Sequence, residues 1–118
     1  MDETFRPRER IKKRNDFQGL YADGTRYKGK YFILIYQARH SDCSRLGVVV
    51  SKKHGNAVHR NRIKRLLRTL FRTNKDLLQS PVDLVLIPKK GIRTAEWISL
   101  RNDYRRAIES IQATVVTK

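Results

Sequence analysis

Residues 51–75 read SKKHGNAVHRNRIKRLLRTLFRTNK and combine an apolar stripe with a dense run of cations. If the chain winds as a helix from Ala57 onward, at about 100° per residue, the two kinds of side chain separate onto opposite sides. The apolar side holds Ile63, Leu66, Leu67, Leu70, Phe71, Leu77 and Leu78. The other side holds Asn61, Lys64, Arg65, Arg68, Arg72 and Lys75. The segment therefore predicts a helix with one face in the core and one cationic face.

The cationic side lacks the acidic residues that neutralise most surface helices. No Asp or Glu occurs between Asp42 and Asp76, so Lys64, Arg65 and Arg68 have no acidic neighbour one helical turn away. Like charges at this spacing destabilise a helix. We therefore expect this side to bind a polyanion, in preference to the simpler alternative of a solvated charged face.

The composition of the whole chain indicates the same class of partner. Its 118 residues include 27 Lys and Arg against 11 Asp and Glu, which gives a net charge of +16. This excess favours binding to phosphates. The length fits a single RNA-binding domain over residues 1–118, with a loosely held arm at residues 1–10 and a frayed end at residues 115–118.

The sequence does not support a membrane protein or a disulfide-stabilised protein. No long apolar segment, signal peptide or lipidation motif is present. The single cysteine, Cys43, provides neither a disulfide framework nor a zinc site. We therefore expect a cytoplasmic protein with no membrane and no disulfide partner.

Helices and strands alternate along the rest of the chain. Asn15 with Gln18 is expected to cap a short first helix that ends at Gly24, and Thr94 is expected to cap the last helix. Strands are expected at residues 26–28, 31–36, 46–50 and 84–87. The last helix is expected to bury Trp97, Leu100, Tyr104, Ile108 and Ile111.

The aromatic strand at residues 31–36 has two apolar faces that must both be covered. Alternation places Tyr31, Ile33 and Ile35 on one face and Phe32, Leu34 and Tyr36 on the other. The order strand, helix, strand over residues 46–87 indicates a crossover between parallel strands. Helices that cover one face of such a sheet leave part of the other open, as in many α+β domains.

The first helix carries a small apolar stripe beside a cluster of cations. Phe17, Leu20 and Tyr21 follow Lys12, Lys13 and Arg14, with Arg10 before them. The stripe is either ordinary core or, because aromatic groups beside cations stack on unpaired bases, a platform for single-stranded nucleic acid.

Catalytic chemistry is weakly supported. His54 and His59 lie in the basic segment, and with His40 they invite the hypothesis of a self-sufficient nuclease. No carboxylate lies close in sequence to either, and their spacing of five separates them on a helix. The chain also shows no zinc spacing, phosphate loop or carboxylate cluster. The preceding strand argues against a helix-turn-helix DNA reader, so structured RNA is the expected partner.

These residues resemble the bacterial ribonuclease P protein component. The resemblance rests on Ser51-Lys52-Lys53, Gly55-Asn56-Ala57-Val58, Arg60-Asn61-Arg62-Ile63-Lys64-Arg65 and Arg68. It extends over nearly the whole chain, through Asp16-Phe17 ahead of Gly24, Leu46-Gly47-Val48 and the strand from Asp83 to Pro88. His54 and His59 stand where the family is variable, which weakens the nuclease hypothesis further.

The resemblance implies an α+β fold of three helices on a mixed four-stranded sheet, in the order helix, strands, helix, strand, helix. This fold is similar to a domain of a ribosomal protein and has a left-handed βαβ crossover. The resemblance also implies that the partner RNA, with bound Mg²⁺, performs catalysis. The protein would help to bind precursor tRNA, and the product would be tRNA with a mature 5′ end. The second-ranked hypothesis is a ribosome-associated RNA-binding protein without a role in cleavage.

Two groups of residues follow from the resemblance, and no catalytic or metal-binding residue is expected in the protein. Facing the catalytic RNA would be Lys52, Lys53, Asn56, Arg60, Asn61, Arg62, Lys64, Arg65 and Arg68. Lining a cleft for the single-stranded 5′ leader would be Lys12, Lys13, Arg14, Phe17, Tyr21, Ile33 and Ile35. Where relatives carry an aromatic residue on the cleft side of the strand, this chain has Ile35. Either the contact there is apolar packing without stacking, or the register is shifted by one residue.

Overall fold

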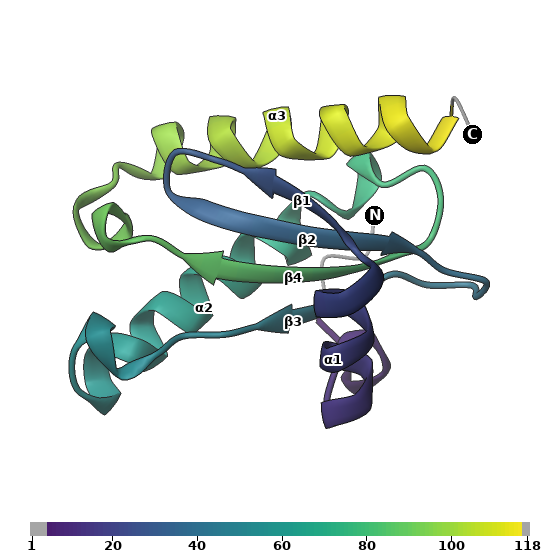
Figure 1. Cartoon of the computed structure of the whole chain (residues 1–118). Helices are drawn as coiled ribbons and strands as arrows, with labels where there is room; N and C mark the ends of the chain where they lie inside the picture. Colours follow the sequence, from purple (N-terminus) through teal and green to yellow (C-terminus); the bar gives the residue numbers. More distant parts are fainter. Residues whose placement is uncertain (1–4, 117–118) are drawn as a thin grey trace.

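A mixed four-stranded sheet and three α-helices make up the computed structural model, which describes residues 5–116 (Figure 1). The strands are β1 (Thr25–Lys28), β2 (Phe32–Ala38), β3 (Arg45–Val48) and β4 (Val82–Pro88). The helices are α1 (Arg14–Asp23), α2 (Ala57–Thr73) and α3 (Trp97–Val116). Short 3-10 turns are η1 (Pro7–Glu9), η2 (Lys52–His54), η3 (Lys75–Leu77) and η4 (Lys90–Thr94). The predicted α+β class and element order are confirmed.

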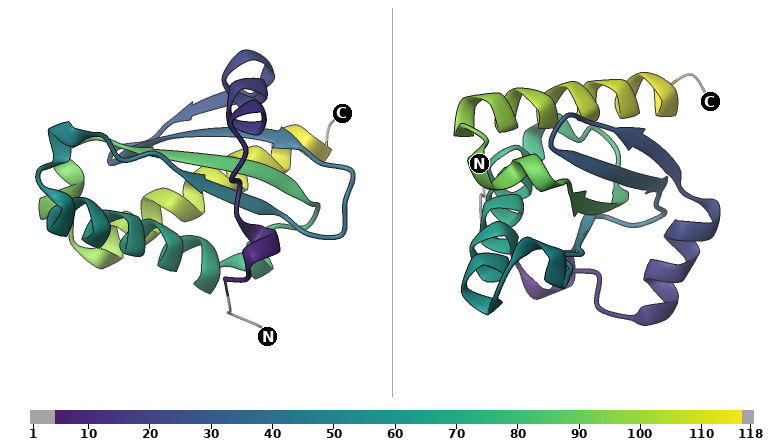
Figure 2. Two further views of the ribbon diagram at one scale, coloured as in Figure 1. Left: turned by 90° about the horizontal axis from the view of Figure 1, so that it is seen from below. Right: turned by 60° about the vertical axis from the view of Figure 1, so that its left-hand side comes forward.

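The sheet has the strand order β1-β2-β4-β3, so the chain crosses between its last two strands. Strand β2 is antiparallel to both β1 and β4, whereas β3 is parallel to β4. Helix α2 makes the crossover on the far side of the sheet in Figure 1, and the connection is left-handed. This is the rare hand for such a unit. Helices α2 and α3 consequently share one face of the sheet, while α1 lies on the other (Figure 2).

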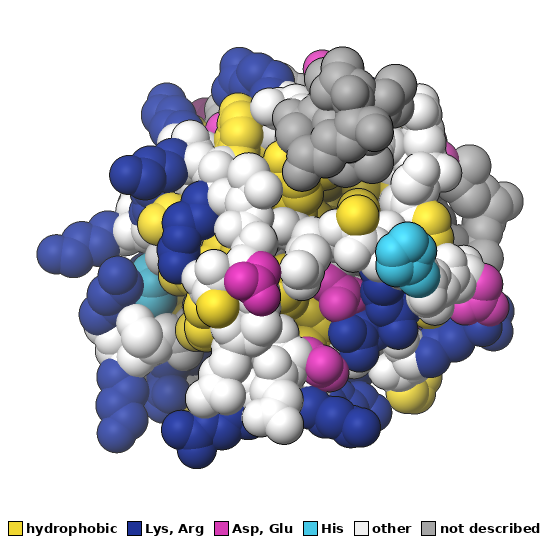
Figure 3. Space-filling model, turned by 45° about the vertical axis from the view of Figure 1, so that its right-hand side comes forward, with side chains coloured by type: hydrophobic (Ala, Val, Ile, Leu, Met, Phe, Trp, Pro, Cys, Tyr) yellow, Lys and Arg dark blue, Asp and Glu magenta, His cyan; other side chains and the backbone are white. Residues whose placement is uncertain are grey.

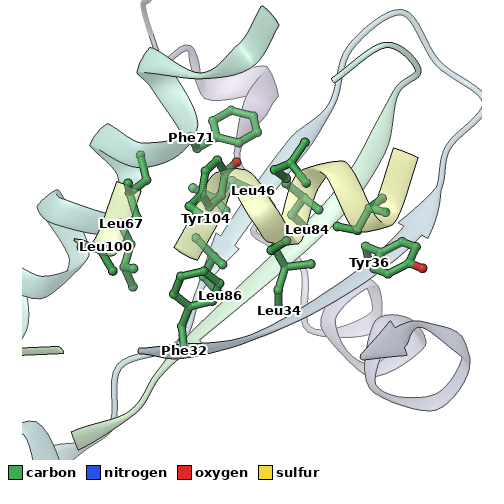
Figure 4. Close-up of a cluster of buried hydrophobic side chains, with 14 of the residues drawn as sticks. Phe32, Leu34, Tyr36, Leu46, Leu67, Phe71, Leu84, Leu86, Leu100 and Tyr104 are labelled. Carbon is green, nitrogen blue, oxygen red and sulfur yellow. The ribbon is translucent and has the colours of Figure 1, made fainter. Parts of the chain in front are cut away.

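The main hydrophobic core lies between the sheet and helices α2 and α3. The side chains of Leu67 and Phe71 from α2 and of Leu100 and Tyr104 from α3 gather over Leu86 and its sheet neighbours (Figure 4). From strand β2 the core takes the predicted alternate set, Phe32, Leu34 and Tyr36. Each fully buried aliphatic side chain stabilises the fold by about 1.5–3 kcal/mol, so the apolar stripe of α2 determines which way that helix faces.

A second, smaller cluster lies under α1 on the opposite face. Ile11, Leu20, Ile35 and Val85 are buried there. Because a single short helix covers this face, Phe17, Ile33, Val49 and Ile87 pack against the cluster but stay half-buried. The sheet face beside α1 is therefore apolar and partly open.

A half-buried ion-pair network fastens α1 to the sheet. The guanidinium of Arg45 donates hydrogen bonds to both carboxylate oxygens of Asp83, at 2.9 and 2.7 Å, and approaches Asp16 of α1 at 3.3 Å. The hydrogen bonds with Asp83 raise the pKa of Arg45 above its ordinary value. The bidentate pair fixes the guanidinium of Arg45 relative to β4, and its further contact with Asp16 ties α1 to this part of the sheet.

The N-terminal segment differs from the expected loose arm. Residues 1–4 lie outside the described residues, but the Phe5 ring packs edge-on against Phe71, with 5.6 Å between ring centroids. Glu9 is buried and forms an ion pair with Lys75, with 2.7 Å between Glu9 Oε2 and Lys75 Nζ. Arg10 forms a parallel bridge with Leu46. These contacts hold residues 5–10 against the body of the protein.

The predicted helix ends were partly wrong. Helix α1 ends before Gly24 as expected, but it begins at Arg14, which places Asn15 inside the helix and not at its cap. Thr94 lies in η4, where its hydroxyl donates to the Gly91 carbonyl at 3.3 Å. It is not the cap of α3, because that helix begins only at Trp97. Of the predicted frayed end at 115–118, α3 includes 115 and 116, and 117–118 lie outside the described residues.

Trp97 is the one member of the predicted α3 core that the structure leaves at the surface. Its side chain is 39% exposed, whereas Leu100, Tyr104, Ile108 and Ile111 are buried. Trp97 is the first residue of α3, and that end of the helix lies at the margin of the sheet (Figure 1). Helical spacing shows which side a residue faces but not whether the core extends that far.

Replacing Tyr104 with Phe is expected to stabilise the protein. The Tyr104 hydroxyl is buried without a hydrogen-bond partner among the described residues, and burial raises its pKa. The substitution keeps the ring against Phe32 and removes a polar group whose burial costs about 1–3 kcal/mol. Thermal unfolding of Tyr104→Phe should therefore show a higher Tm. Tyr36→Phe is the control, since that hydroxyl points away from the cluster (Figure 4). A lower Tm for Tyr104→Phe would mean that the hydroxyl is hydrogen-bonded.

Candidate nucleic-acid interface

The start of α2 is shaped by a glycine and an asparagine. Gly55 adopts φ 109°, in the left-handed region that favours glycine. Asn56 is the N-cap, and its side-chain oxygen accepts a hydrogen bond of 3.1 Å from the backbone N–H of His59. The turn η2 directly before it leaves Lys52 and Lys53 exposed beside the helix N-terminus.

The nine residues predicted to face the catalytic RNA lie on η2, at the N-cap of α2 and along α2. We call this set the cationic face: Lys52, Lys53, Asn56, Arg60, Asn61, Arg62, Lys64, Arg65 and Arg68. Arg60, Lys64 and Arg68 are half-buried and the other six are exposed. Within the described part of the chain, none of these cations forms an ion pair with an acidic side chain. Lys75, predicted on the same side, is instead paired with Glu9.

Like charges crowd this face. Burial lowers the pKa of Arg68, and the positive charge of Arg10 lowers it further. Both effects disfavour the charged form of the guanidinium, and a bound anion would relieve them. Basic side chains also protrude along the left and lower edges of the molecule in Figure 3, and most acidic side chains in that view lie away from those edges.

A depression of about 460 Å³ lies on this face. Its lining residues are Phe5, Asn61, Lys64, Arg65, Arg68, Thr69 and Arg72. Four of the seven are cations and none is acidic. Guanidinium groups form paired hydrogen bonds with phosphate oxygens, so the depression fits a segment of nucleic-acid backbone.

The second candidate surface is the open sheet face beside α1. Phe17 sits over Gly47, where an added Cβ would approach the Phe17 ring to 2.5 Å, so the glycine makes room for the ring. We call the half-buried and exposed residues here the α1 surface: Lys12, Lys13, Arg14, Phe17, Tyr21, Ile33, Val49 and Ile87. The three cations are exposed at the start of α1, and Tyr21 is 39% exposed.

Ile35 does not belong to this surface, and its prediction as a leader-binding residue was wrong. It faces α1 as the alternation predicted, with Tyr36 on the other side of the sheet, so the register is not shifted. However, Ile35 is 0% exposed, because α1 covers it. Gly24 lies so close that an added Cβ would be 2.7 Å from Ile35 Cγ2.

Sequence reasoning missed several residues on this face. Val49 and Ile87 contribute to the apolar floor beside Ile33. Arg26 and Lys28 pair with Ile35 and Ile33 across β1 and β2, and directly opposed residues share a face of the sheet. Their charge and strand positions were visible in the sequence, but the pairing that places them here was not.

His54 and His59 make contacts typical of structural, not catalytic, histidines. His54 is buried, and its Nε2 lies 3.1 Å from the Pro88 carbonyl, which ties the turn before α2 to the end of β4. His59 Nδ1 lies 3.4 Å from a guanidinium nitrogen of Arg93. Neither contact supplies the carboxylate that would orient a catalytic histidine. No group of three or more His, Cys, Asp or Glu side chains suited to a metal occurs within the described residues.

The one cysteine, Cys43, is a free thiol. No helix in the described part of the chain is long and apolar enough to cross a membrane.

Known sequences share this pattern. The family model described as Ribonuclease P matches residues 5–112. The ribonuclease P protein component of Thermotoga maritima is 40% identical over 92 residues, which cover 78% of this chain and 79% of the relative. The protein of the same name from Petrotoga mobilis is 31% identical over 115 residues, covering 94% and 98%.

Solved structures agree with the sequence comparison. The ribonuclease P protein of Thermotoga maritima superposes with a TM-score of 0.78 at 31% identity, covering 86% of this chain and 96% of that one. The Staphylococcus aureus ribonuclease P protein gives 0.77 at 32% identity, covering 87% and 94%. With its fold, its cationic face and these matches, the chain belongs to the bacterial ribonuclease P protein family, the non-catalytic subunit of the endoribonuclease that processes tRNA 5′ ends.

Proposed function

We propose that this chain acts as a single RNA-binding domain whose two surfaces hold two different RNAs. The cationic face docks on the folded catalytic RNA, and the α1 surface holds the single-stranded 5′ leader of precursor tRNA. The observation that carries the proposal is their placement: α2 and α1 lie on opposite faces of the sheet (Figure 2). Both RNAs can therefore be bound at once.

The chemistry of each surface suits its proposed ligand. The cationic face has guanidinium and ammonium groups that form no ion pair with an acidic side chain among the described residues, which fits the phosphates of a folded RNA. The α1 surface combines Phe17, Tyr21 and an aliphatic floor with Lys12, Lys13 and Arg14. Apolar and aromatic groups contact unstacked bases, and flanking cations contact their phosphates. Of the predicted leader residues we retain all but Ile35.

We assign the Mg²⁺ of the reaction to the RNA, because RNA phosphates supply the hard oxygen ligands that magnesium prefers. We also place the holoenzyme in the cytoplasm, in keeping with a bacterial tRNA-processing role. Membership of the family removes the alternative of a ribosome-associated protein without a role in cleavage.

Processing of a precursor tRNA at low Mg²⁺ tests the proposal. Protein alone, catalytic RNA alone and both together are compared for release of the 5′ leader. Cleavage should require the RNA and rise strongly when the protein is added, since the protein increases affinity for the precursor. Cleavage by the protein alone, lost in His54→Ala or His59→Ala, would contradict the proposal. So would a rate that the protein does not change.

Arg65→Ala is expected to weaken assembly with the catalytic RNA and to make it less salt-dependent. Each lost phosphate contact releases fewer counterions, so the slope of log affinity against log salt should fall by about 0.7–0.9. Filter binding over a salt series measures both quantities. Arg106→Ala is the matched control, because its 65% exposed side chain lies on α3 outside the cationic face. A slope as steep as in the wild type would exclude Arg65 as a phosphate contact.

Phe17→Ala is expected to spare assembly with the catalytic RNA but to weaken binding of precursors that carry a leader. Loss of one base–aromatic contact corresponds to about 1–3 kcal/mol in precursor affinity. Affinities of the assembled holoenzyme for precursor and mature tRNA are measured side by side. Gln18→Ala, at an exposed neighbouring position of α1, is the control. Equal losses for both tRNAs would show that Phe17 serves only as core.

A further inference from the structure

Trp97 and α2 together form a depression that extends from the edge of the cationic face towards the start of α3. It measures about 410 Å³ and is lined by Arg62, Arg65, Leu66, Thr69 and Trp97. The exposed Trp97 side chain therefore lies beside the side chains of two arginines from the cationic face. Helix α2 and the start of α3 lie on the same side of the sheet, which brings these distant segments together (Figure 2).

A smaller depression continues this one along α2. It measures about 160 Å³, and its lining residues are His59, Arg62, Ile63, Leu66, Ile92, Arg93 and Ala95. The two share Arg62 and Leu66, so they form one groove between α2 and the segment that leads into α3. We call it the Trp97 groove.

Charge decides what kind of ligand the Trp97 groove can accept. Its charged lining residues are all arginines, and no acidic side chain lines either depression. Glu96 precedes Trp97 in the chain but is not among the lining residues. A second copy of this chain would bring another net charge of +16 against the groove. The groove therefore favours a polyanion that also carries flat apolar groups.

We propose that the Trp97 groove binds an unpaired nucleotide of the catalytic RNA, with its base stacked on Trp97 and its phosphates paired with Arg62 and Arg65. This inference rests on the proposed function. It adds that the RNA contact extends beyond phosphates to one flipped-out base. An aromatic side chain flanked by cations is the arrangement that proteins use for unstacked bases.

The intrinsic fluorescence of Trp97 provides a direct test, because it is the only tryptophan in the chain. Catalytic RNA is titrated into wild-type protein, and emission and affinity are measured together. Stacking of a base on the indole should quench emission with the same midpoint as binding. Unchanged emission at saturating RNA would overturn the proposal, even if every Trp97 variant failed to fold.

Two substitutions separate stacking from bulk. Trp97→Leu keeps an apolar side chain without an aromatic ring and should lower RNA affinity by roughly 5- to 100-fold, whereas Trp97→Phe should retain most of it. Ile98→Ala is the control, because Ile98 is 69% exposed and lies outside the groove lining. Wild-type affinity in Trp97→Leu would overturn the proposal.

The outcomes separate this inference from the proposed function. The groove proposal alone fails if Trp97→Leu binds the RNA normally and the RNA does not quench Trp97, while the wild type and Ile98→Ala bind and Arg65→Ala is impaired. Absence of RNA binding by the wild type would remove both. A third result is that, without RNA, the emission of Trp97 falls as the protein concentration rises, with a dimer seen in sedimentation. That result would assign the groove to a second copy of the chain and overturn the proposal.

Discussion

The division of α2 into an apolar and a cationic side is the constraint on which the structure depends. Ile63, Leu67, Leu70 and Phe71 must be buried against the sheet, and this orientation turns the intervening cations outward. Among the described residues, the cations of the cationic face as defined above form no ion pair with an acidic side chain, and burial with the nearby charge of Arg10 lowers the pKa of Arg68. The contacts that stabilise the fold therefore also create the demand for a polyanionic ligand.

The left-handed crossover decides on which face of the sheet α2 lies. By placing α2 and α3 on one face of the sheet, it leaves the other face to α1 alone. A helix of ten residues cannot cover four strands, so an apolar strip remains open beside it. Arg45 and its carboxylate partners hold α1 where Phe17 borders that strip. Incomplete coverage of the sheet is thus what makes a second binding surface possible.

Local patterns predicted most of the secondary structure, including the helix that carries the cationic face. The basic helix, the four strands and the alternation along β2 were correct, because periodicity and residue type act over a few neighbouring residues. The errors concern Asn15, Thr94, Ile35 and Trp97. Each depended on something outside its own segment: where a helix starts relative to the sheet, or how far another element extends over it.

From the sequence alone one could determine that the protein is basic, binds RNA and presents a cationic helix, and the motif in that helix indicated the family. Charge and the spacing of apolar residues are properties of the sequence, so they can be read without knowing the tertiary structure. Tertiary structure alone decided that Ile35 is covered while Ile33, Val49 and Ile87 stay accessible, and that Trp97 meets Arg62 and Arg65. Burial and proximity depend on contacts between residues far apart in the chain, which no local pattern encodes.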